Sequence, residues 1–171
     1  MAYLRAMARR IKTPRPRDGA LPQLAESAPC PCGSGRPYGE CCGALHSGRA
    51  AAATAQLLMR ARYSAFAVHD AEFLLKSWHP STRPRQVDFD PRVRWSRLEI
   101  VATGDGGPFH RSGTVEFRAH YTERGQPGEQ REVSRFVRED GEWVYLGPLP
   151  PERTRPGVAV PTPPGPRTPR V

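Results

Sequence analysis

All four cysteines of this 171-residue chain lie within thirteen residues, at Cys30, Cys32, Cys41 and Cys42. They form two close pairs, which are separated by a segment that begins Gly-Ser-Gly. Glycine adopts backbone angles that are closed to other residues, so the chain can turn tightly there and bring the pairs together. Four thiolates that converge in this way are the ligand set of a tetrahedral, structural zinc ion. The sequence therefore predicts one zinc per chain as a structural cofactor.

Other thiol chemistry would use the same four residues. Two disulfides would require a bridge between adjacent cysteines or across a single residue, and both geometries are unfavourable. The first residues are basic and no apolar stretch of signal-peptide length follows them, which favours a cytoplasmic location where thiols stay reduced. A redox switch stays open beside zinc. His46 lies one helical turn beyond Cys42 and is an alternative fourth ligand.

Helical periodicity follows the cysteine cluster. Residues 50–70 place their apolar side chains on one broad arc of a helix, wide enough to bury against a sheet, and Thr54 is a candidate N-cap. Asp70 is placed to cap a second helix over residues 71–78, which Pro80 would end. The sequence thus predicts two consecutive helices and then a loop to about residue 91.

Four segments with strand character come next, over residues 93–103, 114–122, 131–139 and 142–146. Apolar and polar side chains alternate in the second segment, as in a half-buried antiparallel strand. A hairpin loop is expected at residues 125–128, and Asp140-Gly141 is a strong two-residue hairpin turn. Helices followed by a four-strand meander predict an α+β domain.

Charged residues interrupt the surfaces that should face the core. Arg62 falls within the apolar arc of the long helix, and Glu132 and Ser134 share a strand face with Phe136. Each buried charge would make the other tolerable, so we expect Arg62 to pair with Glu132. The pair could fix helix register, Arg62 could extend to the rim, or the cluster could line a ligand cavity. The candidate cavity residues are Arg62, Tyr63, Trp78, His79, Trp95, Glu132, Ser134, Phe136 and Tyr145.

The net charge of +9 is concentrated at the two ends of the chain. Residues 1–27 carry six basic and two acidic side chains, and residues 148–171 carry four basic and one acidic, with nine prolines. Both ends are expected to be disordered and solvated, because proline lacks the backbone donor of regular structure. Such tails give at most weak, salt-sensitive binding to nucleic acid. No stretch is long and apolar enough for a membrane span.

The motifs bring a resemblance to known families. The run Cys-Pro-Cys-Gly-Ser-Gly, followed by Tyr38 and Cys41-Cys42-Gly43, resembles the SEC-C zinc motif. With the segments Trp78-His79-Pro80-Ser81-Thr82-Arg83 and Trp143-Val144-Tyr145, the order is similar to the YchJ family of uncharacterised bacterial proteins. The resemblance covers about residues 28–147. It implies a zinc knuckle over 28–48 and, over 50–147, a domain like nuclear transport factor 2, a cystatin-like cone of helices on a curved sheet. It implies no established activity.

Three classes of function are compatible with these features. We expect a non-enzymatic binding or adaptor module whose partner is a protein. The first alternative is a small-molecule binder or enzyme that uses Glu132 as a base in the cone. The second is nucleic-acid or ribosome association through the knuckle and the basic ends. The convex face of such a sheet also makes a homodimer an expectation.

Overall fold

The protein was analysed as a computed structural model, which describes residues 24–150. Most of the two ends expected to be disordered therefore lies outside the described residues. The elements are the short helices η1 (Tyr38–Glu40), α2 (Cys42–His46) and α4 (Ala71–Lys76), the longer helix α3 (Ala55–Val68), and four strands. The strands are β1 (Val93–Asp105), β2 (Ser112–Glu123), β3 (Gln126–Glu139) and β4 (Glu142–Pro148).

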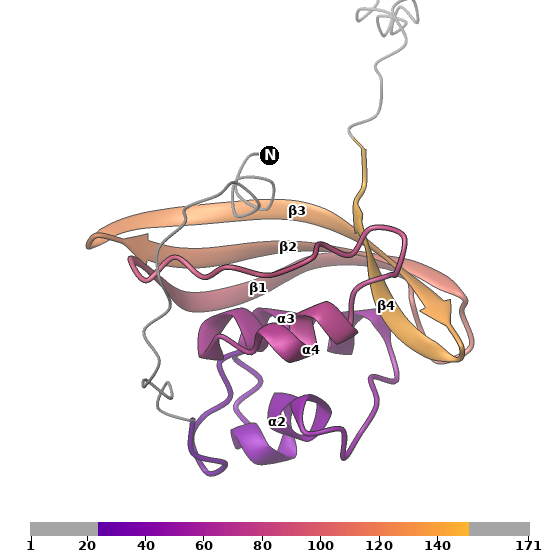
Figure 1. The fold of residues 1–171 in the computed structure, drawn as a ribbon, viewed down its shortest axis with the longest axis horizontal. Coiled ribbons are helices and arrows are strands. Elements are labelled where there is room, and N and C mark those ends of the chain that lie inside the picture. Colours follow the sequence, from indigo (N-terminus) through magenta and orange to yellow (C-terminus); the bar gives the residue numbers. More distant parts are fainter. Residues whose placement is uncertain (1–23, 151–171) are drawn as a thin grey trace, which may run out of the picture.

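The strands form one antiparallel sheet in the order β1-β2-β3-β4, as expected for an α+β meander. Helices α3 and α4 cover one face of this sheet, and α2 lies on the far side of α3 (Figure 1). The molecule therefore has three layers, with α3 in the middle. Within the described residues no helix is long and apolar enough to cross a bilayer.

The helix ends follow from local side-chain chemistry. Thr54 caps α3 by accepting a hydrogen bond from Leu57 N at 3.1 Å, and Asp70 caps α4 by accepting one from Phe73 N at 2.9 Å. Both caps were predicted, but α3 does not begin at Ala50. Thr54 has extended backbone angles, as an N-cap requires, so the helix starts only at Ala55.

The β-hairpin turns are tight. Asp140 and Gly141 both have positive φ, at 50° and 86°, which is the conformation of the predicted two-residue turn. The prediction of a hairpin loop over residues 125–128 is wrong. The strands pair as far as Glu123 and Gln126, so the turn consists of Arg124 and Gly125 alone.

The core lies between α3 and the inner face of the sheet. Leu58, Ala61 and Ala65 of α3 are buried in one cluster with side chains of the sheet, and α3 itself contacts β1, β2 and β4. The same continuous core also contains Cys30, Cys32 and Cys42. The cysteine segment is therefore packed onto the α+β domain through shared apolar contacts.

Candidate metal centre and cone pocket

Backbone hydrogen bonds fold the first cysteine pair into a closed loop. Cys30 N donates to Arg36 O at 3.0 Å, and Gly33 N donates to Cys30 O at 3.0 Å. Gly33 and Gly35 have φ values of 75° and 76°, which side chains other than glycine rarely adopt. The Gly-Ser-Gly segment therefore makes the turn that the sequence predicted and directs the chain back toward the second pair.

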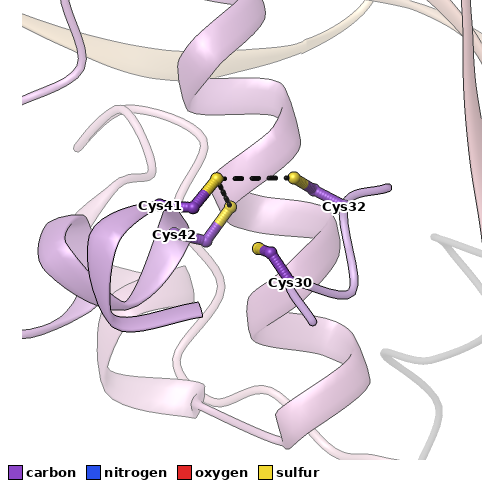
Figure 2. Close-up of side chains that lie close together, drawn as sticks. All are labelled: Cys30, Cys32, Cys41 and Cys42. Carbon is purple, nitrogen blue, oxygen red and sulfur yellow. Dashed lines mark hydrogen bonds between the residues drawn. The ribbon is translucent and has the colours of Figure 1, made fainter. Parts of the chain in front are cut away.

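The four thiols converge on one point. Their sulfur atoms all lie within 4.8 Å of one another. Cys41 Sγ is 3.7 Å from Cys32 Sγ and 4.0 Å from Cys42 Sγ (Figure 2). A tetrahedral ion with metal–sulfur bonds of about 2.3 Å requires sulfurs about 3.8 Å apart, and all four cysteines are free thiols. The cluster therefore has the dimensions of a four-coordinate metal site.

The electrostatics of the cluster favour a bound cation. Hydrogen bonds from neighbouring thiols, first that of Cys30, lower the pKa of Cys32 far below its ordinary value. Hydrogen bonding to Cys30 and Cys32 raises the pKa of Cys42 in turn, and burial acts in the same direction. The thiols are therefore close enough to shift one another's pKa. A cation at the centre would release thiol protons, because metal ligation requires thiolates.

His46 has both ring nitrogens occupied by other groups. Nε2 lies 2.9 Å from Ala61 O, which can only accept, so Nε2 carries the proton. Nδ1 then accepts from the hydroxyl of Tyr38 at 2.7 Å. Burial lowers the pKa of His46 and favours this neutral form. The arrangement leaves the fourth ligand position to Cys42 and makes His46 a link between α2 and α3.

Further polar contacts attach the cysteine loop to α3. Arg60 Nη1 donates to Cys32 O at 2.9 Å, and Cys30 Sγ lies 3.7 Å from Ser64 Oγ. Cys30, Cys32 and Cys42 are at most 5% exposed, whereas Cys41 is half-buried. The candidate metal centre is thus built onto α3 rather than carried on a free knuckle.

A second site lies between α3 and the sheet. We call it the cone pocket and define it by its lining: Met59, Arg62, Tyr63, Phe66, Trp95, Phe117, Ala119, Gln130, Glu132, Ser134 and Tyr145. Arg62 is only 3% exposed. Its Nη1 donates to Leu74 O at 2.9 Å and to Ser77 Oγ at 2.7 Å. Leu74 O belongs to the last turn of α4, and it accepts from Ser77 Oγ at 3.2 Å as well as from Arg62.

Aromatic rings surround the guanidinium of Arg62. Its central carbon lies 4.7 Å from the ring centroid of Trp78 and 4.5 Å from that of Tyr145. Burial lowers the pKa of Arg62 to about 10, and Tyr145 and Glu132 oppose the shift. The side chain therefore stays charged at neutral pH, stabilised by ring faces as well as by hydrogen bonds.

The predicted direct ion pair between Arg62 and Glu132 is wrong. Glu132 Oε1 instead accepts from Ser134 Oγ at 2.7 Å and from the Tyr145 hydroxyl at 2.8 Å. Burial, followed by the charge of Glu132, raises the pKa of Tyr145, so its hydroxyl stays a donor. Arg62 and Glu132 thus line one pocket with Tyr145 between them, and each is satisfied by neutral partners.

Other residues predicted for the cavity have different positions. Trp78 contacts Arg62 and Tyr145 from outside the lining, and Phe136 is fully buried in the core 5.7 Å from the Tyr145 ring. His79 faces Glu139 and Ser81 instead. His69 ends α3 in a left-handed conformation and stacks on Phe89.

The sequence analysis missed several lining residues of the cone pocket. They carried a usable signal, because Phe117 and Ala119 alternate on the inner face of β2 and Gln130 shares the face of Glu132 on β3. The missed residues are Met59, Phe66, Phe117, Ala119 and Gln130.

Comparisons with known proteins agree with both parts of the structure. Residues 54–148 match the family model "YchJ, middle NTF2-like domain", and residues 27–44 match the SEC-C motif. This chain belongs to the YchJ family. The UPF0225 protein SCO1677 of Streptomyces coelicolor is 56% identical over 117 residues, which is 68% of this chain and 91% of the relative. A UPF0225 protein of Streptomyces avermitilis is 52% identical over 136 residues, covering 79% and 94%.

Two solved structures share the fold of this YchJ family member. The solution structure of RPA3114, a SEC-C motif containing protein from Rhodopseudomonas palustris, has a TM-score of 0.62 at 29% identity and covers 71% of this chain and 98% of that one. The crystal structure of a SEC-C motif containing protein from Psychrobacter arcticus has a TM-score of 0.60 at 25% identity, covering 80% and 86%. The chain therefore consists of a SEC-C motif followed by an NTF2-like domain. The four cysteines of the SEC-C motif can hold a metal ion.

Proposed function

We propose that this protein is a non-enzymatic, zinc-stabilised binding module of the cytoplasm whose partner is another protein. The observation that carries this proposal is the closed set of four sulfurs within 4.8 Å of one another. Four protein ligands leave no open position at which zinc could activate water, so the metal serves structure. Thiolate ligands suit zinc, and free cysteines suit a reducing compartment.

A fully exposed aromatic side chain supports the binding role. Phe109, in the loop between β1 and β2, is 99% exposed. The backbone of this loop is held in place, because the Arg138 guanidinium donates to Pro108 O at 2.9 Å and to His110 O at 3.1 Å. Arg138 is itself held 4.8 Å from the ring centroid of Trp143. A large apolar side chain on a fixed loop is suited to insertion into an apolar pocket of a partner protein.

The proposal is tested by quantitative affinity capture from the cytoplasm of a related bacterium. Phe109→Ala should abolish recovery of the partner while zinc content and fold are unchanged. Val101→Ala, which also removes an exposed apolar side chain, is the matched control and should bind normally. Nuclease-sensitive recovery would instead favour nucleic-acid association through the basic ends. Equal recovery with wild type and Phe109→Ala would contradict the proposed surface.

A further inference from the structure

The cone pocket has a polar end that is independent of the metal centre. All hydrogen bonds of Arg62 to described residues use Nη1. Its Nε and Nη2 make no hydrogen bond to a described residue. Neither atom is among the described polar atoms that are fully enclosed without a partner, so both retain some access to open space. Since the side chain is 97% buried, the space that these two nitrogens reach is the pocket that Arg62 lines. Nε and Nη2 form one edge of the guanidinium, which presents two parallel donors to an acceptor.

A carboxylate oxygen lies in the same pocket. Both hydrogen bonds that Glu132 accepts end on Oε1, so Oε2 has no hydrogen-bond partner among the described residues. Glu132 and Arg62 both line the cavity. A ligand in the pocket would therefore meet the two donors of Arg62, Nε and Nη2, and the acceptor Oε2 of Glu132. The opposite charges of these two groups make a neutral occupant more favourable than an ion of either sign.

Aromatic and apolar side chains form the rest of the wall. Tyr63 and Phe66 of α3 both pack on Trp95, with ring centroids 5.9 and 6.2 Å apart, and Phe117 lies on the sheet side. The centres of water-sized groups can occupy about 40 Å³ of this pocket, and its empty space, which includes open solvent, amounts to about 480 Å³. The pocket therefore suits a small ligand only. Any flat ring in it would meet the aromatic wall.

We infer that the cone pocket binds a small, neutral, planar molecule that carries a carboxamide or an equivalent group. The carbonyl oxygen accepts from Nε and Nη2 of Arg62, and the amide N–H donates to Oε2 of Glu132. The attached ring packs among the aromatic side chains of the wall. This inference does not depend on the proposed protein partner, because Phe109 is not part of the pocket lining.

The test uses three probes of similar shape, namely benzamide, benzoate and toluene, added to the full-length zinc-bound protein. Benzamide should shift the NMR signal of the Trp95 indole N–H with a dissociation constant in the millimolar range, as expected for so small a ligand. The Trp143 indole N–H, which donates to Ala53 O, should not shift and serves as an internal control. Benzoate should bind at least about tenfold more weakly, because its charge faces Glu132. Toluene lacks polar groups and should also bind more weakly.

Variants separate the two polar groups. Glu132→Gln should reduce the preference for benzamide over benzoate by about tenfold or more, since it removes the repulsive charge. Glu129→Gln is the matched control, because Glu129 lies on the same strand but pairs with His120. The Glu129→Gln variant should prefer benzamide over benzoate as strongly as the wild type does. Arg62→Lys keeps the charge without the double donor and should lose both ligands.

Three results would overturn the assignment. The first is an unshifted Trp95 signal at tens of millimolar benzamide. The second is tighter binding of benzoate than of benzamide to the wild type. The third is an unchanged preference in Glu132→Gln. Because Glu132→Gln keeps the size and hydrogen-bonding capacity of the side chain, the assignment stays testable even if Arg62 variants fail to fold.

Discussion

Single residues in this protein join parts that are distant in sequence. His46 of α2 donates from Nε2 to Ala61 O of α3 and accepts at Nδ1 from the Tyr38 hydroxyl of η1, and Arg60 connects α3 to the cysteine loop through Cys32 O. Arg62, two residues further along α3, extends in the other direction to α4 and the cone pocket. One helix therefore supports both candidate sites, and substitutions at these positions should have separable effects.

The first prediction concerns metal ligation by the cysteines. Protein purified without added metal should contain about one zinc per chain, and Cys32→Ser should release it because a neutral hydroxyl replaces a thiolate. Elemental analysis measures both values. Cys42→Ser should also lose zinc, whereas His46→Ala should keep it, because the His46 nitrogens bond Tyr38 and Ala61 instead. Full zinc retention in Cys32→Ser would contradict the four-cysteine site.

The second prediction concerns the pH dependence of stability. Burial lowers the pKa of His46 in the folded state, so the fold holds the neutral imidazole and acid favours unfolding. This contribution to stability is fully present above the ordinary histidine pKa of about 6.5 and is lost as pH falls through the lower, folded value. Chemical denaturation at a series of pH values between 7.5 and about 5 measures it.

His46→Gln provides the comparison for this prediction, because glutamine cannot be protonated. The difference in unfolding free energy between wild type and His46→Gln should shrink as the pH falls. Wild type and His46→Gln are compared at the same pH and the same metal concentration, so that protonation of the thiolates affects both proteins equally. A difference that is independent of pH would contradict the role assigned to the neutral ring.

At the scale of elements, local chemistry explains which boundaries were predictable. Thr54, Asp70 and the dipeptide Asp140-Gly141 have strong intrinsic preferences for caps and tight turns, and all three act as predicted. The Arg124-Gly125 turn was missed because arginine rarely adopts a positive φ, here 51°. Gly128 suggested a loop from sequence, yet it lies in β3.

Contacts between residues that are distant in sequence explain which features could not be predicted from the sequence. A Cβ at Gly128 would lie 2.6 Å from the Tyr121 ring, so glycine is needed there by a cross-strand neighbour. The inward direction of Arg62 and Glu132 followed from periodicity. Their partners did not, because Leu74 O becomes available only where α4 ends and the Tyr145 hydroxyl arrives from β4. The convergence of the four cysteines was the most predictable feature because these residues are close in sequence.

The third prediction concerns the coupling of α3 to α4 and the sheet. Arg62→Met removes two hydrogen bonds and leaves Leu74 O with a bond only from Ser77 Oγ, so unfolding free energy should fall by about 1–3 kcal/mol. Although Arg62 and Glu132 form no ion pair, they share Tyr145 and line one pocket, so Arg62→Met and Glu132→Leu should show a coupling energy of about 0.5–3 kcal/mol rather than add. Denaturant unfolding of the double-mutant cycle measures it, and a coupling of about 3 kcal/mol or more would indicate a direct ion pair.

At the scale of the whole molecule, the two family modules share one core. The SEC-C cysteines belong to the same core cluster as Leu58 and Ala61 of α3, and α3 contacts both α2 and the sheet. A knuckle held only by a linker would unfold by itself without affecting the rest of the chain. Here the middle layer is common to both modules, so their stabilities should be linked.

The last prediction follows from this linkage. Removal of metal by a chelator should lower the melting temperature of the entire described fold by more than about 10 °C, because binding energy at a structural zinc site contributes to folding. Unfolding should remain a single transition when followed both by far-UV circular dichroism and by tryptophan fluorescence, since Trp78, Trp95 and Trp143 are all remote in sequence from the cysteines. The matched variant Cys32→Ser should melt at the temperature of the chelated wild type and should not respond to chelator. Two separate transitions, with the tryptophan signal unchanged by chelation, would show instead that the knuckle folds independently of the sheet.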